Sequence, residues 1–221
     1  MPSGVFKKLG GRYKRIRKRP RGRPNQDVYE YKMEVLGELE QLSEQEVIDL
    51  FYGDESHVCS EKYVPYGCGR PLPQFPGERV FIPSEKAYRL NCWGLISRQN
   101  ECYWHTSEHS IDSHFVLERL DMLSLSIHKP TFIVLDNASI HTAKIIRARI
   151  PIWQKRGLYL FYLPTYSPQL NIAETMWRHL KGGGLRPEDY RDDQTLAYAV
   201  NRCLANVGRC LNINFSPFNA K

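Results

Sequence analysis

The chain has 221 residues, which suffices for one domain with a sizeable core and a small appendage. Its apolar content of 42% excludes an intrinsically disordered chain, and no apolar run approaches the ~20 residues that a bilayer span requires. The net charge of +7 comes from residues 1–26, which hold ten of the 31 Lys and Arg residues and no Asp or Glu.

The N-terminus and the cysteines indicate a cytoplasmic protein. No apolar stretch follows the basic N-terminal residues, so we expect no secretory signal and no membrane partner. The six cysteines include no Cys-x-x-Cys pair, which argues against a structural zinc site. In a chain of this size without a signal, we expect reduced thiols rather than disulfides.

Residues 1–26 form a basic arm, rich in Gly, Pro and Arg, that we expect to be disordered when free. Its motif Pro-Arg-Gly-Arg-Pro resembles the core of an AT-hook, in which a glycine lets the backbone lie deep in the DNA minor groove. Arg21 and Arg23 would extend along the groove floor, with Arg19 beside them. The same residues also suit a generic arm that binds phosphates, and the sequence leaves both interpretations open.

The rest of the chain mixes helices and strands. A connecting helix is predicted at 27–47, where apolar residues recur at helical spacing, and a strand at 50–54. Prolines and glycines concentrate at 57–84, which indicates a loop or hairpin. The later elements are predicted in this order: strands at 89–97 and 101–106, a helix at 111–127, a strand at 132–136, a helix at 142–154 broken or kinked at Pro151, a strand at 158–163, a helix at 171–181 that stops at the glycines 182–184, and a helix at 192–207.

This order predicts one α/β domain with a mixed sheet flanked by helices. The strand at 132–136 is apolar throughout and is expected near the centre of the sheet, and the strand at 158–163 is expected to be buried as well. We divide the chain into four parts: the basic arm at 1–26, the connecting helix at 27–47, the α/β domain at 48–210 and a tail at 211–221.

Three carboxylates stand at the ends of predicted elements. Asp54 and Asp136 each end a strand, and Glu174 lies on the first turn of a helix. A site that holds two divalent metal ions for phosphodiester chemistry requires such a set of acids on rigid elements. Glu55 adjoins Asp54, but successive side chains alternate between the two faces of a strand, and Asp54 shares a face with the alternate apolar residues before it. We therefore choose Asp54 and keep Glu55 as an auxiliary candidate.

Three blocks of residues carry a resemblance to a known family: Asp54-Glu55 after a strand, Asp136-Asn-Ala-Ser-Ile-His141, and Leu163-Pro-Thr-Tyr-Ser-Pro168 running into Asn171, Glu174 and Trp177. Over residues 45–210 the chain resembles the catalytic domain of DDE transposases of the mariner superfamily and of related bacterial insertion-sequence transposases. The resemblance implies a ribonuclease-H-like fold. Where many relatives have Asn-Pro-Ile-Glu, this chain has Asn-Ile-Ala-Glu, a change that is not expected to move the carboxylate.

The resemblance implies that Asp54, Asp136 and Glu174 form a catalytic triad that holds two Mg²⁺ or Mn²⁺ ions. The implied activity is cleavage of double-stranded DNA at the ends of an insertion sequence, followed by transfer of the freed 3′ end to target DNA. The resemblance also implies a homodimer and a nucleoid-associated place in the cytoplasm. Asn137 and His141 are further auxiliary candidates, and His141 would position a metal ligand, touch DNA or bond to the local backbone.

Two other interpretations stay open. One is a truncated relic that binds DNA without cutting it, and the other is a ribonuclease-H-like nuclease that cuts without joining strands. In each case, neighbouring acids repel one another when no metal is bound, so we expect Asp136→Asn to raise the stability of the metal-free protein.

Overall fold

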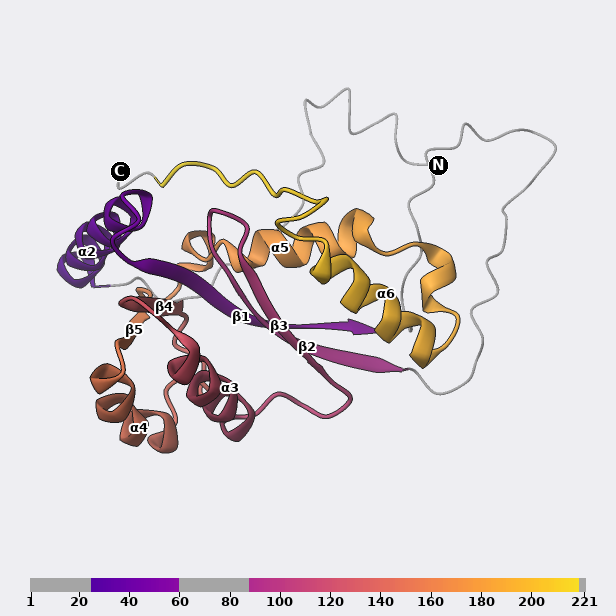
Figure 1. The fold of residues 1–221 in the computed structure, drawn as a ribbon, viewed down its shortest axis with the longest axis horizontal. Helices are drawn as coiled ribbons and strands as arrows, with labels where there is room; N and C mark the ends of the chain where they lie inside the picture. The colour runs from indigo at the N-terminus through magenta and orange to yellow at the C-terminus, as the bar shows by residue number, and fades with distance from the viewer. Residues whose placement is uncertain (1–24, 60–87, 219–221) are drawn as a thin grey trace, which may run out of the picture.

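The computed structural model describes residues 25–59 and 88–218, and a five-stranded sheet runs through its centre (Figure 1). The strands are β1 (Asp49–Cys59), β2 (Arg89–Ile96), β3 (Cys102–Ser107), β4 (Thr131–Leu135) and β5 (Leu158–Tyr162). The arginines of the AT-hook-like motif, nearly all of the predicted loop at 57–84 and the last three residues lie outside the described part.

The sheet is mixed, as the sequence predicts. Its strand order is β3-β2-β1-β4-β5, in which β1 pairs antiparallel with β2 and parallel with β4. The β2–β3 pair is antiparallel and the β4–β5 pair is parallel. The first strand of the chain therefore lies at the centre of the sheet, where the antiparallel half meets the parallel half.

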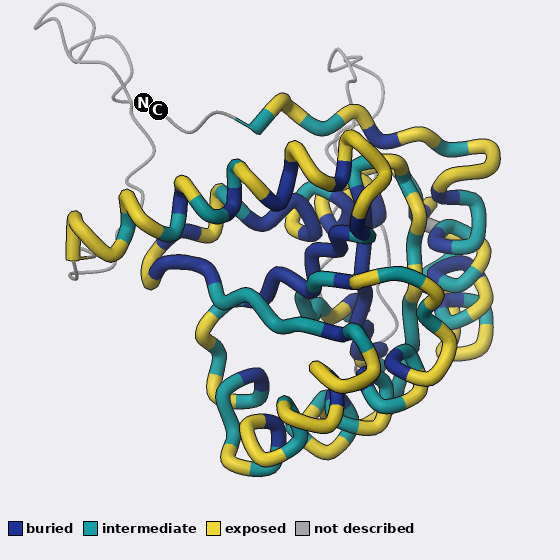
Figure 2. Tube along the Cα trace, turned by 60° about the vertical axis from the view of Figure 1, so that its left-hand side comes forward, coloured by how far each residue is buried: buried dark blue, intermediate teal, exposed yellow. Residues whose placement is uncertain are grey.

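Helices cover both faces of the sheet and bury two separate cores. On one face, α2 (Gln26–Glu44), α5 (Ala173–His179) and α6 (Asp193–Ala205) contribute apolar side chains to the larger core. On the other face, α3 (Ser113–Ser126) and α4 (Lys144–Lys155) enclose the smaller one. The buried segments of Figure 2 follow these inward faces. Three short helical turns, η2 (Pro168–Leu170), η3 (Leu180–Gly184) and η4 (Pro187–Tyr190), complete the described chain.

Side-chain caps explain where two of the helices begin. Asp112 accepts a hydrogen bond from the Phe115 amide at the start of α3, and Asp192 accepts one from the Thr195 amide at the start of α6. An N-terminal cap of this kind satisfies amides that have no partner inside the helix. Pro151, predicted to break or kink its helix, lies inside α4, which continues to Lys155.

Three predicted elements differ from the observed ones. β1 continues to Cys59, so Asp54 lies within a strand and not at its end, because β2 supplies backbone partners along this whole length. β5 is an edge strand and is only half-buried, except for Leu158. The helix after Asn171 begins at Ala173 and does not stop at the glycines, since η3 continues the helical path as a π-helical turn to Gly184.

Helix α2 is fastened to the sheet by a buried polar cluster. The Glu40 carboxylate accepts a hydrogen bond from the Tyr52 hydroxyl on β1. It also accepts from Nε of Arg98, in the β2–β3 turn, which lies 2.7 Å from Glu40 Oε1 and 2.6 Å from Oε2. Arg98 also donates to the backbone carbonyl of Ser216 at 2.8 Å. A buried carboxylate that is paired and fully hydrogen-bonded avoids most of the cost of leaving water. The predicted connecting helix is thus packed into the α/β unit and is not a free linker.

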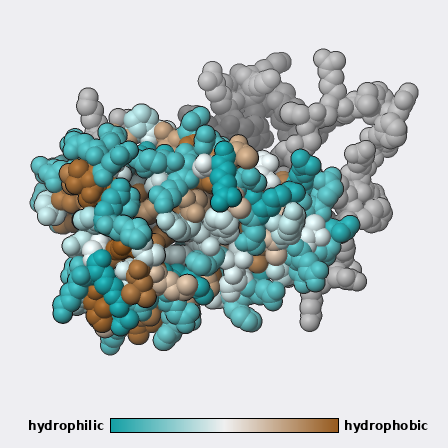
Figure 3. Space-filling view, in the orientation of Figure 1, coloured by the Kyte–Doolittle hydropathy of each residue, from teal (hydrophilic) through white to brown (hydrophobic). Residues whose placement is uncertain are grey.

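The face of the molecule drawn in Figure 3 is mostly hydrophilic, with small hydrophobic patches. Large apolar side chains are exposed on α2 at Val28 and Tyr31, and on α3 at Met122 and Leu125. Tyr31, which the helical spacing predicts to face inward, is 66% exposed. Among the described helices, none is both long and apolar enough to cross a membrane.

Candidate active site

The candidate site lies where β1 extends beyond its parallel neighbour. The β1–β4 pairing runs from Asp49 opposite Thr131 to Tyr52 opposite Val134. β4 ends one residue later, and Asp136 is the first residue after it. Asp54 is two residues past the last parallel pair on β1. Both carboxylates thus lie just past the C-terminal end of the parallel pairing between β1 and β4.

Helix α5 brings the third carboxylate to the same place. Asp54 lies opposite Gly94 on β2, and a side-chain carbon at Gly94 would stand 2.9 Å from Met176 Cε and 3.0 Å from the Trp177 ring. The missing side chain at Gly94 therefore lets α5 lie directly on the sheet beside Asp54. Glu174, in the first turn of this helix, is exposed.

The charges around Asp54 show that the acids lie within reach of one another. Burial first, and then the negative charges of Glu55, Asp136 and Glu174, raise the pKa of Asp54 to about 7. An acid that is both partly desolvated and surrounded by like charges holds its proton more strongly. Asp136 and Glu174, the other two acids of the predicted triad, therefore both act electrostatically on Asp54, as does the adjacent Glu55.

Asp136 has a different environment, which His141 creates. His141 Nδ1 lies 2.8 Å from Asp136 Oδ1, and the Ala138 amide donates to the same oxygen at 2.9 Å. Since an ionised carboxylate only accepts hydrogen bonds, Nδ1 carries the hydrogen. The bond from His141 lowers the pKa of Asp136, while burial opposes it. Asp136 is therefore the acid whose charge the protein stabilises, whereas Asp54 is the one whose charge it opposes.

His141 is fully buried and lies between two acids. Its Nε2 is 3.5 Å from Glu55 Oε2, and among residues 25–59 and 88–218 neither of these buried atoms has a hydrogen-bond partner. The Tyr162 hydroxyl donates to the His141 carbonyl at 2.8 Å, which fixes the backbone of the turn. Of the three roles that the sequence leaves open for His141, this geometry corresponds to the first, in which the imidazole orients an acid of the triad.

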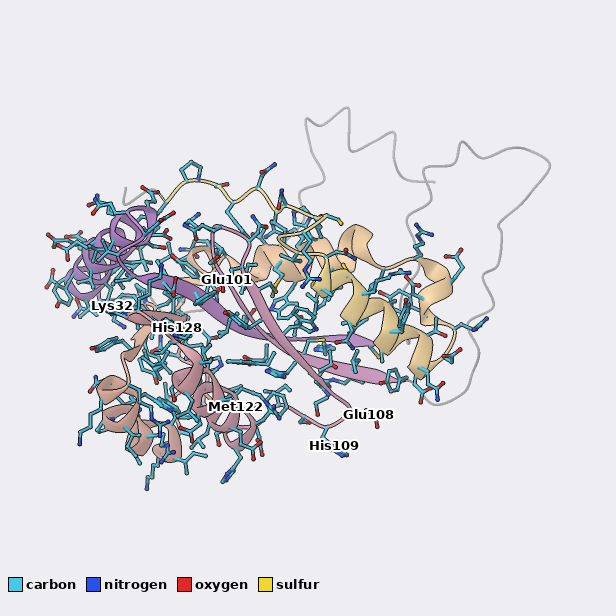
Figure 4. All side chains as sticks on the ribbon, viewed as in Figure 1. Lys32, Glu101, Glu108, His109, Met122 and His128 are labelled. Atoms are coloured by element: carbon cyan, nitrogen blue, oxygen red, sulfur yellow. The ribbon has the colours of Figure 1, made fainter. Side chains whose placement is uncertain are left out.

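Asn137, the other auxiliary candidate, points away from the acids. Its side-chain amide donates to the Leu163 carbonyl at 2.6 Å, just after β5. Lys32 on α2 donates to the same carbonyl at 3.3 Å and to the Tyr162 carbonyl at 2.6 Å (Figure 4). These bonds hold the end of β5 against the turn that follows Asp136, so Asn137 supports the site without facing it.

Lys181 is a basic residue near the acids that the sequence analysis missed. Burial lowers the pKa of its ammonium group, and the thiol of Cys92 and the carboxylate of Asp54 oppose that shift. Lys181 follows Glu174 by seven residues, about two helical turns, which places both on one side of a helix. That spacing is the signal in the sequence from which it could have been found.

The family of the chain follows from a match over this region. The family model of the DDE superfamily endonuclease matches residues 49–197, which span β1 to the first turn of α6 and include all three acids. The chain belongs to the DDE superfamily endonucleases. No curated protein matches the sequence.

Solved structures similar to this DDE endonuclease are complexes of a mariner transposase. A Mos1 paired-end complex with Mg shares 15% identity at a TM-score of 0.60, covering 92% of this chain and 62% of that chain. A Mos1 paired-end complex with the left transposon end has 15% identity and a TM-score of 0.52, covering 94% and 70%. A Mos1 complex with Mn has 15% identity and a TM-score of 0.51, covering 95% and 71%. The expected ribonuclease-H-like fold and the resemblance to DDE transposases are confirmed.

The donors of the DDE endonuclease site fit a hard divalent cation. They are carboxylate oxygens, which Mg²⁺ and Mn²⁺ prefer, and their mutual repulsion would be relieved by a bound cation. Within residues 25–59 and 88–218, no three of the His, Cys, Asp and Glu side chains are grouped closely enough to hold a metal ion. A metal ion would therefore have to draw the acids closer together than they stand here.

Proposed function

We propose that this DDE endonuclease is the catalytic domain of a transposase that cuts DNA at transposon ends and joins the freed 3′ end to target DNA. The observation that carries the proposal is the concentration of acids around Asp54. Burial and three neighbouring carboxylates together raise its pKa to about 7. So much unbalanced negative charge is costly in a protein that only binds DNA, whereas a metal-dependent nuclease requires it.

Asp54, Asp136 and Glu174 would hold two Mg²⁺ or Mn²⁺ ions. When bound, such ions activate a water or a 3′-hydroxyl and stabilise the leaving oxygen. His141 keeps the Asp136 carboxylate in one orientation through the 2.8 Å bond from Nδ1. Glu55 lies near the other nitrogen of the ring, with Oε2 3.5 Å from His141 Nε2.

DNA would approach across basic groups next to the acids. Lys181 is near Asp54, and the neighbouring Arg178 and His179 line a surface cavity of about 450 Å³. Cationic side chains beside a carboxylate site attract the phosphate backbone without reading its sequence. The basic arm with Arg19, Arg21 and Arg23 would add a second contact, in the minor groove or on phosphates.

The complexes formed by the similar Mos1 proteins support the partner that we propose. Those Mos1 proteins were solved as complexes with transposon ends, or as paired-end complexes with Mg or Mn. By analogy, the present chain would act on double-stranded transposon ends as a homodimer, in the nucleoid-associated fraction of the cytoplasm. We also propose that the site uses two metal ions and that the DNA ends are those of an insertion sequence.

The proposal is tested by nicking of supercoiled plasmid in Mn²⁺ with three proteins: wild type, Asp136→Asn and Asp112→Asn. Asp112 caps α3 through its side chain, a role that asparagine keeps, so this control makes the same chemical change away from the acids. We expect cutting by wild type and Asp112→Asn and none by Asp136→Asn. If wild type binds DNA but never cuts it, the chain acts as a DNA-binding relic. If it cuts but never joins a 3′ end to a second duplex, it is a nuclease.

A further inference from the structure

Asn171 joins two distant parts of the site through its side chain. Its Nδ2 donates to the Gly53 carbonyl on β1 at 2.9 Å, and its Oδ1 accepts from the Ala173 amide at the start of α5 at 3.1 Å. The residue is 5% exposed, so these bonds are shielded from water. Asn171 belongs to the third block of residues that carries the family resemblance, and the resemblance implies no role for it.

The Gly53 carbonyl lies at the point where the sheet loses a strand. Parallel pairing between β1 and β4 ends at Tyr52, one residue before Gly53, because β4 stops while β1 continues. A buried carbonyl next to the end of a ladder needs a hydrogen bond from elsewhere. The side chain of Asn171 supplies that bond, although 118 positions separate it from Gly53 in the chain.

The other half of the Asn171 side chain caps α5. The residue directly before this helix, Ile172, has no side chain able to cap it, and Asn171 serves instead through its Oδ1. The backbone carbonyl of Asn171 also accepts from the Glu174 amide at 3.3 Å. The same residue therefore orders the first turn of the helix, which carries Glu174.

The two ends of this bridge are each adjacent to a candidate metal ligand. Gly53 precedes Asp54 and Ala173 precedes Glu174, so one amide group links the backbones that carry the first and third acids. Packing of Met176 and Trp177 against Gly94 holds α5 against the sheet, but such apolar contacts do not fix its position along β1. The two hydrogen bonds of Asn171 are directional, and they therefore fix the position of α5 along β1.

We propose that Asn171 is a positioning residue that sets the placement of Glu174 relative to Asp54 and thereby the affinity of the site for divalent metal. This inference rests on the proposed function. Groups that orient the ligands of a metal typically change its affinity by about 10–100-fold when they are removed. Asn171 touches neither metal nor DNA in this role, so its effect is expected in metal affinity before any effect in DNA binding.

The test is Mn²⁺ binding to the DNA-free protein by titration calorimetry, with wild type, Asn171→Ser and Asn100→Ser. Serine at 171 can still cap α5 but is too short to reach Gly53. Asn100 makes a similar bridge in the β2–β3 turn: Nδ2 donates to the Ile213 carbonyl at 3.2 Å, and Oδ1 accepts from the Ile213 amide at 2.7 Å. Because Asn100 also has a φ of 66°, its replacement by serine is expected to cost at least as much stability.

We expect Asn171→Ser to weaken Mn²⁺ binding by about tenfold or more and to shift the Mn²⁺ dependence of plasmid nicking equally, while Asn100→Ser stays within about twofold of wild type. If both variants bind Mn²⁺ alike, Asn171 is only structural and the inference fails while the proposed function stands. If wild type neither binds Mn²⁺ nor nicks plasmid, the proposed function itself fails and takes the inference with it.

Should Asn171→Ser not fold, Asn171→Asp replaces it. Aspartate keeps the cap on α5 and loses the bond to Gly53, yet adds a negative charge beside the site. Added charge alone would tighten Mn²⁺ binding, so weaker binding by Asn171→Asp supports the bridge, and equal or tighter binding overturns it.

Discussion

Replacing Asp54 by asparagine is expected to stabilise the metal-free protein at neutral and alkaline pH. Burial first, and then the charges of Glu55, Asp136 and Glu174, raise the pKa of Asp54 from 3.8 to about 7. The unfolded chain releases this proton near the lower value, whereas the folded chain keeps it up to the higher one. Stability therefore falls as pH rises between the two values, and above pH 7 the full cost remains.

The size of this cost follows from the shift. About three pKa units correspond to at most about 4 kcal/mol, since each unit is worth roughly 1.4 kcal/mol. Asparagine has nearly the shape of the protonated acid and no charge at any pH, so Asp54→Asn escapes the penalty. The free energy of unfolding of the variant is expected to match that of wild type near pH 4 and to exceed it by up to about 4 kcal/mol at pH 8.

Urea unfolding in EDTA at pH 4, 6 and 8, followed by circular dichroism, measures the difference. Asp112→Asn serves as the matched control, because it makes the same chemical change at the exposed cap of α3. A difference between Asp54→Asn and wild type that does not grow with pH would refute the reasoning, since it would mean that neither burial nor the neighbouring acids raise the pKa of Asp54.

Three other substitutions probe the surroundings of Asp54. Asp136→Asn is predicted to lower the stability of the metal-free protein at pH 7 by roughly 1 kcal/mol, because His141 stabilises the Asp136 charge. This is the opposite of the expectation from sequence, and a variant that is more stable in urea unfolding would contradict it. Gly94→Ala is expected to lower stability by about 1–3 kcal/mol by pushing α5 off the sheet, and an unchanged melting temperature in calorimetry argues against that packing. Lys32→Met keeps the apolar stem and removes the charged donor to the Tyr162 carbonyl, so we expect a loss of about 1–2 kcal/mol in thermal unfolding, with no loss if the bond does not form in solution.

Local patterns were enough to predict much of the sheet, the position of Asp136 directly after its strand and the face of β1 that carries Asp54. The apolar run before Asp136 predicts a strand that ends at the acid, and β4 ends at Leu135. Alternation along β1 predicts the face of Asp54 correctly, since Leu50 and Tyr52 lie in the larger core and Phe51 in the smaller one. These features depend on residues that are neighbours in the chain, which is why pattern alone reveals them.

Features that depend on distant partners were not predictable. The length of β1 is set by pairing with β2, and the exposure of β5 by its place at the edge of the sheet. The sequence indicates a helix stop at the glycines after Lys181, yet the chain continues as a π-helical turn. The sequence also led to the expectation that repulsion would destabilise the Asp136 charge. Only the folded chain shows that the hydrogen bond from His141 stabilises this charge, and that the destabilised charge is the one on Asp54.

The buried Glu40 cluster shows that the stable folding unit extends beyond the residues that match the family model. The family match starts at residue 49, after α2, and stops at 197, before the chain segment that carries the Ser216 carbonyl. A protein trimmed to that match would lose the carboxylate that the Tyr52 hydroxyl and the Arg98 guanidinium both bind, together with the α2 side chains that pack in the larger core. The matched region is therefore expected to need the helix before it and the segment after it in order to fold stably.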